Sequence, residues 1–165
     1  KQNIMEIQKL LIPELEHEVA LTEKFLRRIP KDKLDWRPHP KSMSIKQLGS
    51  HLAELPSWVV GTMSQDEMIM DEYKPPINGN VDDMIKTLKS AAKEAADSLK
   101  VANSEYDKKW KMIQGGKTVM EMPKYQVLRG MVLNQFPHHR AQLGVCLRLL
   151  NESVPATYGP SADEQ

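Results

Sequence analysis

The sequence has a single cysteine among its 165 residues, and aromatic side chains make up only 5% of it. Because Cys146 has no second cysteine to pair with, an internal disulfide is excluded, and we expect a reducing, cytoplasmic location. No apolar run approaches the roughly 20 residues that a transmembrane helix requires, and no secretory signal pattern opens the chain. We therefore expect a protein that has no membrane partner.

Charge of one sign is also lacking, because 23 Lys and Arg stand against 22 Asp and Glu and the formal net charge is +1. A nucleic-acid surface needs several basic clusters, and this sequence has only one near an aromatic residue, Arg27 with Arg28. We therefore expect no nucleic acid partner. The GxSxG, P-loop, GxGxxG and CxxC motifs of common hydrolase, nucleotide and redox sites are absent as well. A chain of this length can nevertheless bury a core without disulfides or a structural metal.

Four stretches of the sequence carry apolar residues at the three- and four-residue spacing of amphipathic helices. Ser44 and Asn80 precede two of these stretches and are predicted N-caps, and Pro30 ends the first. The expected helices cover about residues 4–29, 44–61, 80–102 and 125–150. Four apolar faces are most simply buried together, so we predict an all-α fold, a four-helix bundle.

Two connections between the expected helices stand out. Residues 61–80 are numerous enough to cross the bundle, so we expect a long crossover between helices 2 and 3. Over residues 109–122 the periodicity changes, and Gly115 and Gly116 lie between two short runs that tolerate β structure, which predicts a small hairpin before helix 4. With no internal repeat and no composition boundary, residues 1–165 are expected to form one domain.

The fourth expected helix places polar side chains inside its apolar stripe, which is centred between Leu128 and Cys146. At about 100° per residue, Gln135, His139 and Gln142 project within roughly 40° of that centre. Polar groups in such a position need partners. Because Gln135 and His139 lie four residues apart, they are one turn apart on one face, as are the two ligands that a helix offers to a metal ion.

A further ligand can come from the second helix, where His51 lies at the stripe edge on the row shared with Leu55 and Trp58. A histidine near an apolar edge is more often a hydrogen-bonded core residue, so this alternative stays open for His51. We interpret Glu18 of the first helix as a partly solvated residue or a hydrogen-bond partner of another helix, rather than a ligand. His138 lies about 80° from the stripe centre and is expected at the rim.

Three segments, taken together, carry a family resemblance. They read WRPHPKSMSIKQLGSHLAELPSW, NQFPHHRAQL and VPATYGPSADE, at residues 36–58, 134–143 and 154–164. In this order they resemble the DinB/YfiT-like family of small four-helix metalloenzymes. In that family, a histidine of the second helix and a pair spaced four apart in the fourth helix bind a divalent metal ion, zinc or nickel. The resemblance therefore implies His51, Gln135 and His139 as the metal ligands.

Two residues depart from the pattern that the resemblance implies. The family usually has a histidine where this chain has Gln135, and a neutral amide is a weaker metal donor than an imidazole. Pro137 removes one backbone hydrogen bond from the fourth helix and disfavours the helical conformation at Phe136, at a cost of about 3 kcal/mol unless the helix kinks. We therefore expect a kink close to the metal site.

The resemblance implies a metal-dependent enzyme with a mononuclear site, a thiol-dependent S-transferase or a related hydrolase or isomerase. Its partners would be a small-molecule substrate and a low-molecular-weight thiol as co-substrate, and the long apolar stripes and the family together favour a homodimer. Gln142 would orient an imidazole of the metal site. Four more residues are expected around the ligands or at the rim of the pocket: His138, Glu54, Trp58 and Arg140.

A hypothesis from another functional class stays open beside this one. The chain could be a non-enzymatic helical dimer or binding module with a degenerate metal site. Gln135, His139, His51 and Gln142 would then form a buried hydrogen-bond network. The glutamine in place of the usual histidine motivates this alternative.

Overall fold

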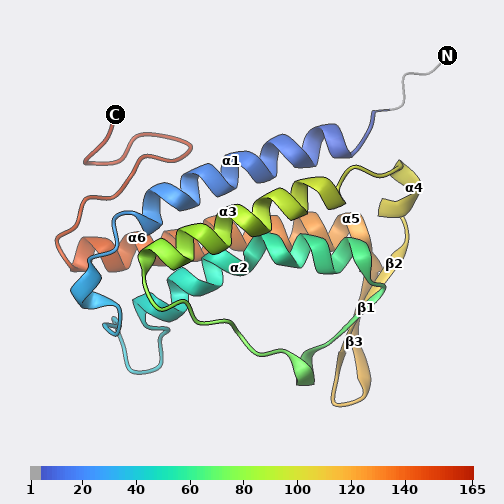
Figure 1. Ribbon diagram of the computed structural model, residues 1–165, viewed down its shortest axis with the longest axis horizontal. Helices are drawn as coiled ribbons and strands as arrows, with labels where there is room; N and C mark the ends of the chain where they lie inside the picture. Colours follow the sequence, from blue (N-terminus) through green and yellow to red (C-terminus); the bar gives the residue numbers. More distant parts are fainter. Residues whose placement is uncertain (1–4) are drawn as a thin grey trace.

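Helices make up most of the structure, a computed structural model that describes residues 5–165. Four long helices form a bundle (Figure 1): α1 (Gln8–Leu26), α2 (Ile45–Ser64), α3 (Val81–Ser98) and α6 (Asn134–Leu149). Each falls within or close to one of the four expected stretches, so this part of the fold prediction is confirmed. The predicted start at Ile4 lies outside the described residues. Within residues 5–165, no helix is long and apolar enough to cross a membrane.

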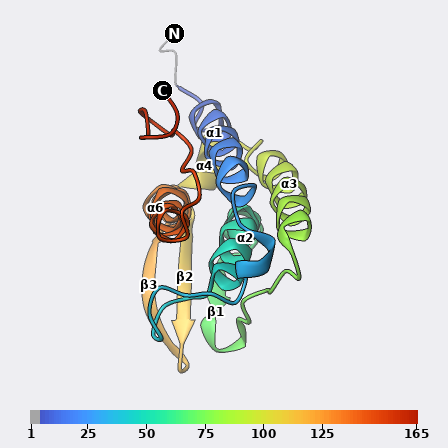
Figure 2. The same ribbon diagram turned by 90° about the vertical axis from the view of Figure 1, so that its left-hand side faces the viewer.

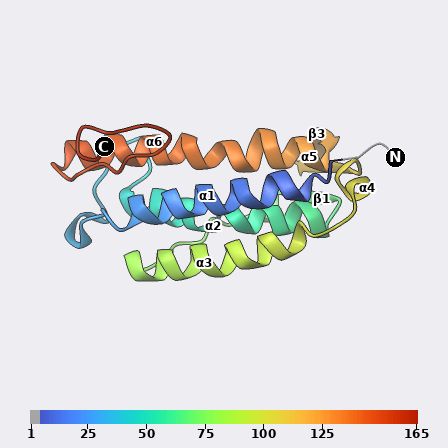
Figure 3. The same cartoon turned by 90° about the horizontal axis from the view of Figure 1, so that it is seen from above.

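The order of the helices around the bundle explains the long crossover. Seen end-on, α1 and α2 lie on one diagonal and α3 and α6 on the other (Figure 2). The chain colours show that α2 and α3 run in the same direction, opposite to α1 and α6 (Figures 1 and 3). Residues 65–80 must therefore return along the length of the bundle before α3 begins, as predicted.

A small sheet at one end of the bundle corrects the all-α prediction. Its strands are β1 (Glu67–Ile69), β2 (Lys109–Gln114) and β3 (Lys117–Pro123), in the order β1-β2-β3. The expected hairpin is β2 and β3, which pair antiparallel around Gly115 and Gly116, both with positive φ, of 57° and 70°. A two-residue hairpin turn needs that conformation at both positions, and glycine adopts it without strain.

Strand β1 was not predicted from the sequence. It is three residues long, belongs to the crossover, and pairs in parallel with β2 through Glu67 and Lys111. Its residues are alternately exposed and half-buried, but the sequence Glu-Met-Ile has no alternation of polar and apolar residues that would signal a strand. The sheet thus ties the crossover to the hairpin. The remaining short elements are η1 (Lys31–Lys33), η2 (Met70–Glu72), α4 (Asn103–Tyr106) and α5 (Lys124–Gln126).

Both predicted N-caps are confirmed. The Ser44 side chain accepts a hydrogen bond from the backbone N–H of Gln47, and the Gln47 side chain accepts one from the backbone N–H of Ser44, which is a complete capping box. Asn80 caps α3 by accepting from the N–H of Asp83. These caps set where α2 and α3 begin, and therefore where His51 lies along α2.

The fourth expected helix is not one regular α-helix. After α5, residues Val127–Leu133 form a π-helical segment, labelled η3, and α6 begins at Asn134. Pro137 is then the fourth residue of α6, which follows η3 without a break and continues past the proline to Leu149. The expected irregularity therefore lies ahead of Pro137, as a π-helical segment, and α6 continues through the proline.

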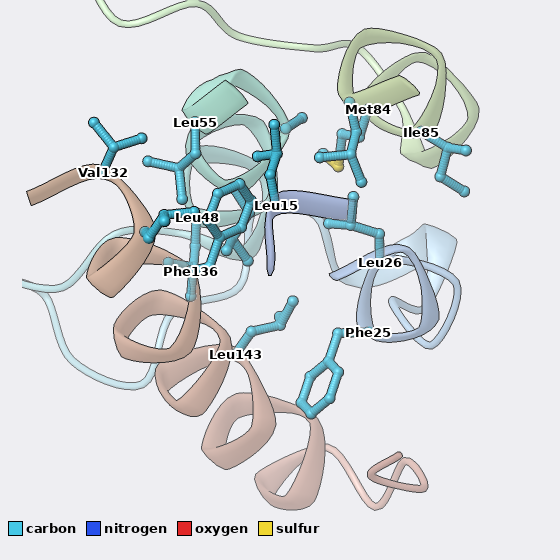
Figure 4. Close-up of a cluster of buried hydrophobic side chains, with 14 of the residues drawn as sticks. Leu15, Phe25, Leu26, Leu48, Leu55, Met84, Ile85, Val132, Phe136 and Leu143 are labelled. Atoms are coloured by element: carbon cyan, nitrogen blue, oxygen red, sulfur yellow. The ribbon is translucent and has the colours of Figure 1, made fainter. Parts of the chain in front are cut away.

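Side chains from all four long helices meet in one core (Figure 4). Gly49 allows α2 to approach α3, because a Cβ at this position would lie 2.7 Å from Sδ of Met84. Tyr106 and Trp110 close the end of the bundle next to the sheet, and both are buried. The core residues drawn and labelled in Figure 4 are Leu15, Phe25, Leu26, Leu48, Leu55, Met84, Ile85, Val132, Phe136 and Leu143.

Candidate metal centre

His51 and His139 lie together between two neighbouring helices. α2 supplies His51 and α6 supplies His139, and the two rings meet edge to face with their centroids 4.5 Å apart and their planes at 85°. His139 is 8% exposed, and the side chain of His51 is 19% exposed. The pair therefore lies at the boundary of the core, where an imidazole can be reached by a small molecule.

Glu54 holds the ring of His51 from the next turn of α2. The two side chains are 2.6 Å apart between Nδ1 and Oε1. A carboxylate can only accept, so Nδ1 of His51 carries a proton, and in the neutral tautomer this leaves the lone pair on Nε2. The hydroxyl of Tyr73 donates to the same carboxylate oxygen at 2.5 Å. Burial and this hydrogen bond raise the pKa of Tyr73 well above its ordinary value, so the hydroxyl stays a donor.

Gln142 holds the ring of His139 by a hydrogen bond to Nδ1, as Glu54 holds the ring of His51. Its Oε1 lies 3.0 Å from Nδ1 of His139, which therefore carries the proton, and its Nε2 lies 3.1 Å from Nε2 of His138. Burial lowers the pKa of His139 below 6.5, against the opposing effect of the hydrogen bond to Gln142. The ring is consequently neutral near pH 7, the form in which an imidazole binds a metal ion.

These hydrogen bonds leave Nε2 of both imidazoles without a partner among the described residues. Two imidazoles, each held through Nδ1 by a neighbouring acceptor, fit a borderline-soft divalent ion such as zinc or nickel. The third predicted ligand, Gln135, lies one turn before His139 and is half-buried. Within residues 5–165, no three His, Cys, Asp or Glu side chains are arranged to hold a metal ion, so a complete donor set needs the Gln135 amide.

Arg140 does not lie beside the histidines, which corrects the expectation that it borders their pocket. It is 2% exposed, and its Nη2 lies 2.8 Å from Oε2 of Glu18 on α1. Consecutive residues of an α-helix project about 100° apart, so Arg140 faces α1 whereas His139 faces α2. The ion pair confirms the interpretation of Glu18 as a partner of another helix.

Gln142 is exposed, not central in the apolar stripe of α6 as predicted. Phe136, Arg140 and Leu147 are buried instead, so the true stripe is displaced around the helix. The prediction assumed 100° per residue from Leu128 onward, but a π-helical turn contains more residues than an α-helical turn and rotates everything that follows. Gln142 nevertheless makes the hydrogen bond to His139 that an orienting role requires.

No sequence pattern indicated that Tyr73 and Trp110 would lie near Glu54. Both border a cavity of about 240 Å³, as do two of the expected pocket residues, Glu54 and Trp58. Tyr73 belongs to the crossover and Trp110 to β2, and neither segment has a helical pattern that would connect it with α2. The contact between His51 and Glu54 could have been predicted from their spacing, because residues three apart are neighbours on a helix surface.

A second cavity, of about 390 Å³, has His139 and Gln142 in its wall. Cys146 lies in the same wall, and burial raises the pKa of its thiol, so it is not an activated nucleophile. The remaining lining residues are Pro38, Ser42, Met43, Leu48 and Val145. One cavity thus has a histidine, His139, in its wall, and the other reaches Glu54, the residue that holds His51.

Comparisons with known proteins agree with this architecture. No curated protein matches the sequence. Three crystal structures share the fold. A DinB-like protein of Bacillus cereus ATCC 10987 has a TM-score of 0.70 and 18% identity, with 91% of this chain and 97% of that chain covered, and the DinB-like protein YjoA of Bacillus subtilis has a TM-score of 0.67 and 15% identity, with 94% and 99% covered. A protein of Exiguobacterium sibiricum 255-15 assigned to the DinB family has a TM-score of 0.68 and 21% identity, with 93% and 98% covered. The sequence also matches the DinB family over residues 5–165. The chain therefore belongs to the DinB family.

Proposed function

We propose that the chain is a metal-dependent enzyme in which His51 and His139 bind one divalent zinc or nickel ion and Gln135 supplies the third ligand. One observation carries this proposal: imidazoles from two helices touch, and each uses Nδ1 for a hydrogen bond and keeps Nε2 free. A histidine that only stabilises a core usually has both ring nitrogens satisfied when it is buried. The pattern here is the one that metal-binding histidines show.

The reaction we propose is the transfer of a low-molecular-weight thiol to an electrophilic carbon. When bound, a divalent metal with an open coordination position lowers the pKa of a thiol and makes it nucleophilic at neutral pH. The sulfur forms a bond to the carbon, the leaving group departs with its bonding electrons, and the thiol proton passes to solvent. The cavity lined by His139 and Gln142, of about 390 Å³, offers space for a substrate next to one of the two imidazoles.

The side chains of this protein would position the reaction and take no covalent part in it. Glu54 and Gln142 fix the orientation and the tautomer of the two imidazoles. Tyr73 retains its proton and holds the Glu54 carboxylate by a hydrogen bond, so it is a positioning residue rather than a base. Cys146 keeps its proton because its thiol is buried.

Elemental analysis tests the metal assignment directly. Untagged protein should contain about one zinc or nickel per chain, and His51→Ala and His139→Ala should each lose it. His17→Ala is the matched control, because His17 is exposed on α1 and should leave the metal content unchanged. Metal content that survives His139→Ala would show that the ligand assignment is wrong.

The competing function is a non-enzymatic helical module, and one observation favours it. Among the described residues no third His, Cys, Asp or Glu joins the two histidines. If the protein takes up no metal even after incubation with zinc or nickel, the bundle has kept the fold without the metal centre. In that case the thiol-transfer proposal fails as well.

A further inference from the structure

The cavity beside Glu54 has features that the metal proposal does not use. We call it the aromatic cavity; it lies between the second half of α2, the crossover and β2, and its volume of about 240 Å³ equals that of roughly eight water molecules in the liquid. Its lining residues are Glu54, Ser57, Trp58, Gly61, Thr62, Gln65, Met68, Tyr73 and Trp110. This is enough space for a small organic molecule of about seven non-hydrogen atoms.

Three aromatic rings form the walls of the aromatic cavity. The rings of Trp58 and Tyr73 meet at 66° with their centroids 5.3 Å apart, so they enclose a corner. Trp110 comes from β2, and it is 2% exposed. Aromatic residues are scarce in this chain, with 3 Trp, 4 Tyr and 2 Phe in all, so three of them around one cavity is a concentrated feature. The face of an aromatic ring attracts a cation.

The charge of the aromatic cavity is negative. Among residues 5–165, no Lys, Arg or His lines it, and Glu54 is its one acidic residue. Oε1 of Glu54 accepts from His51 and Tyr73, whereas Oε2 accepts no hydrogen bond from the described residues. A carboxylate oxygen without a partner, next to aromatic faces, attracts a cation and repels an anion.

The space next to the aromatic cavity is also negatively charged. A neighbouring cavity of about 440 Å³ shares Gln65, Met68 and Tyr73 with it. Three acidic residues line this second space, namely Asp66, Glu67 and Glu72. Lys124 compensates one of them, through an ion pair of 3.0 Å with Asp66. Two uncompensated carboxylates therefore remain at the entrance, in a protein whose net charge is +1.

We propose that the aromatic cavity binds a small organic ammonium ion. The alkyl groups of the ion would contact the faces of Trp58 and Tyr73, and its charge would lie near Oε2 of Glu54. This site needs no metal ion, so it does not depend on the proposed function. Because Glu54 also holds His51, a bound ammonium ion would contact the side chain that positions one of the two candidate ligands.

Choline and its uncharged analogue 3,3-dimethylbutan-1-ol provide a matched pair of probes with the same shape. In ¹H–¹⁵N spectra of the full chain, choline should shift the indole signals of Trp58 and Trp110 and leave that of Trp36 unchanged. The uncharged analogue should bind at least about tenfold more weakly, since it lacks the cation–π attraction. Equal binding of the two, shifts at Trp36 alone, or no shift at saturating choline would overturn the proposal.

Variants separate this site from the metal centre. Trp58→Leu should weaken choline binding at least about tenfold, whereas Trp36→Phe, the matched control, should not change it. Tyr73→Phe keeps the ring and should stay within about threefold. Glu54→Gln should weaken binding about tenfold through loss of charge. Choline binding should also survive EDTA, so a failure of the metal proposal leaves this test intact, whereas unchanged binding in Trp58→Leu contradicts the assignment.

Discussion

Two consecutive residues of α6 belong to two different polar clusters, and the clusters are built in opposite ways. His139 faces α2 and meets His51, whereas Arg140 faces α1 and meets Glu18. Both side chains are buried, with 8% and 2% exposure. Burial of a polar residue therefore does not by itself distinguish a functional site from a structural one in this bundle.

The difference lies in the partners of the polar atoms: Oε2 of Glu18 makes no hydrogen bond but contacts the Arg140 cation at 2.8 Å, whereas Nε2 of each histidine has no polar partner among the described residues. Arg140 donates to the hydroxyl of Tyr158 at 2.6 Å, to Oγ1 of Thr22 at 3.4 Å and to the backbone oxygen of Glu18 at 3.3 Å. Tyr158 in turn donates to the Glu18 carboxylate at 2.5 Å, which fastens the C-terminal segment to α1 and α6. Nε2 of each histidine has no partner among the described residues, and His139 lines a cavity of about 390 Å³. We conclude that the Arg140 cluster stabilises the fold and the histidine pair is available to a ligand.

The largest expected effect is the loss of stability when the Arg140 cluster is disrupted. Arg140→Met should lower the free energy of unfolding by about 3–5 kcal/mol, because Glu18 is left buried without its cation. Urea denaturation at pH 7 measures this loss. The exposed ion pair of Arg148 and Asp163 supplies the control, since Arg148→Met should change stability far less. A double variant, Arg140→Met with Glu18→Leu, should recover most of the loss.

The next effect tests the other side of the comparison. Adding zinc or nickel at 100 times its dissociation constant should raise the free energy of unfolding by about 2.7 kcal/mol, and EDTA should reverse the change. Melting curves of wild type and His139→Ala, with and without metal, measure this stabilisation. His139→Ala should abolish this stabilisation by metal. Glu18→Gln should be less stable than wild type without metal but should gain the same stabilisation when metal is added. A metal response lost in Glu18→Gln but kept in His139→Ala would invert the roles of the two clusters.

A smaller effect sharpens the role of the residues that hold the imidazoles. Gln142→Met removes the acceptor at Nδ1 of His139 with little change in shape, and should weaken metal binding about 10- to 100-fold. Gln135→His should have the opposite sign, because an imidazole is a better donor for zinc or nickel than an amide. Competition titration with a chromogenic chelator measures both. Tighter binding in Gln142→Met would contradict the positioning role.

Helices and caps could be predicted because their signals are local. Ser44 and Asn80 mark helix starts by their own side-chain hydrogen bonds, and Gly115 with Gly116 marks the hairpin by its backbone requirement. Strand β1 could not be predicted, since its three residues are ordered by pairing with a strand that lies 40 or more residues further along the chain.

The candidate site was predictable only in part, for a related reason. The four-residue spacing and the second-helix histidine placed His51 and His139 together correctly, because helix periodicity is reliable over one or two turns. The phase of α6 relative to Leu128 was wrong, since the π-helical segment between them has no signal in a pattern read at 100° per residue. This error placed Gln142 in the stripe. Tyr73 reaches Glu54 from the crossover, whose path follows from the whole bundle.

The smallest expected effect uses pH to separate the two clusters. Burial keeps the folded-state pKa of His139 below its unfolded value of 6.5, so the unfolded chain binds a proton that the folded chain resists. The contribution of this residue to stability is therefore fully present above pH 6.5 and is lost as the pH falls from 6.5 toward the folded pKa. Urea denaturation between pH 7.5 and 5.5, in EDTA, should show a downward slope that His139→Gln reduces. The double variant Arg140→Met with Glu18→Leu removes both charges of the other cluster and leaves no buried carboxylate to titrate, so it should not change this slope. An unchanged slope in His139→Gln would mean that His139 does not carry the pH dependence, and that the two clusters differ in pairing but not in protonation.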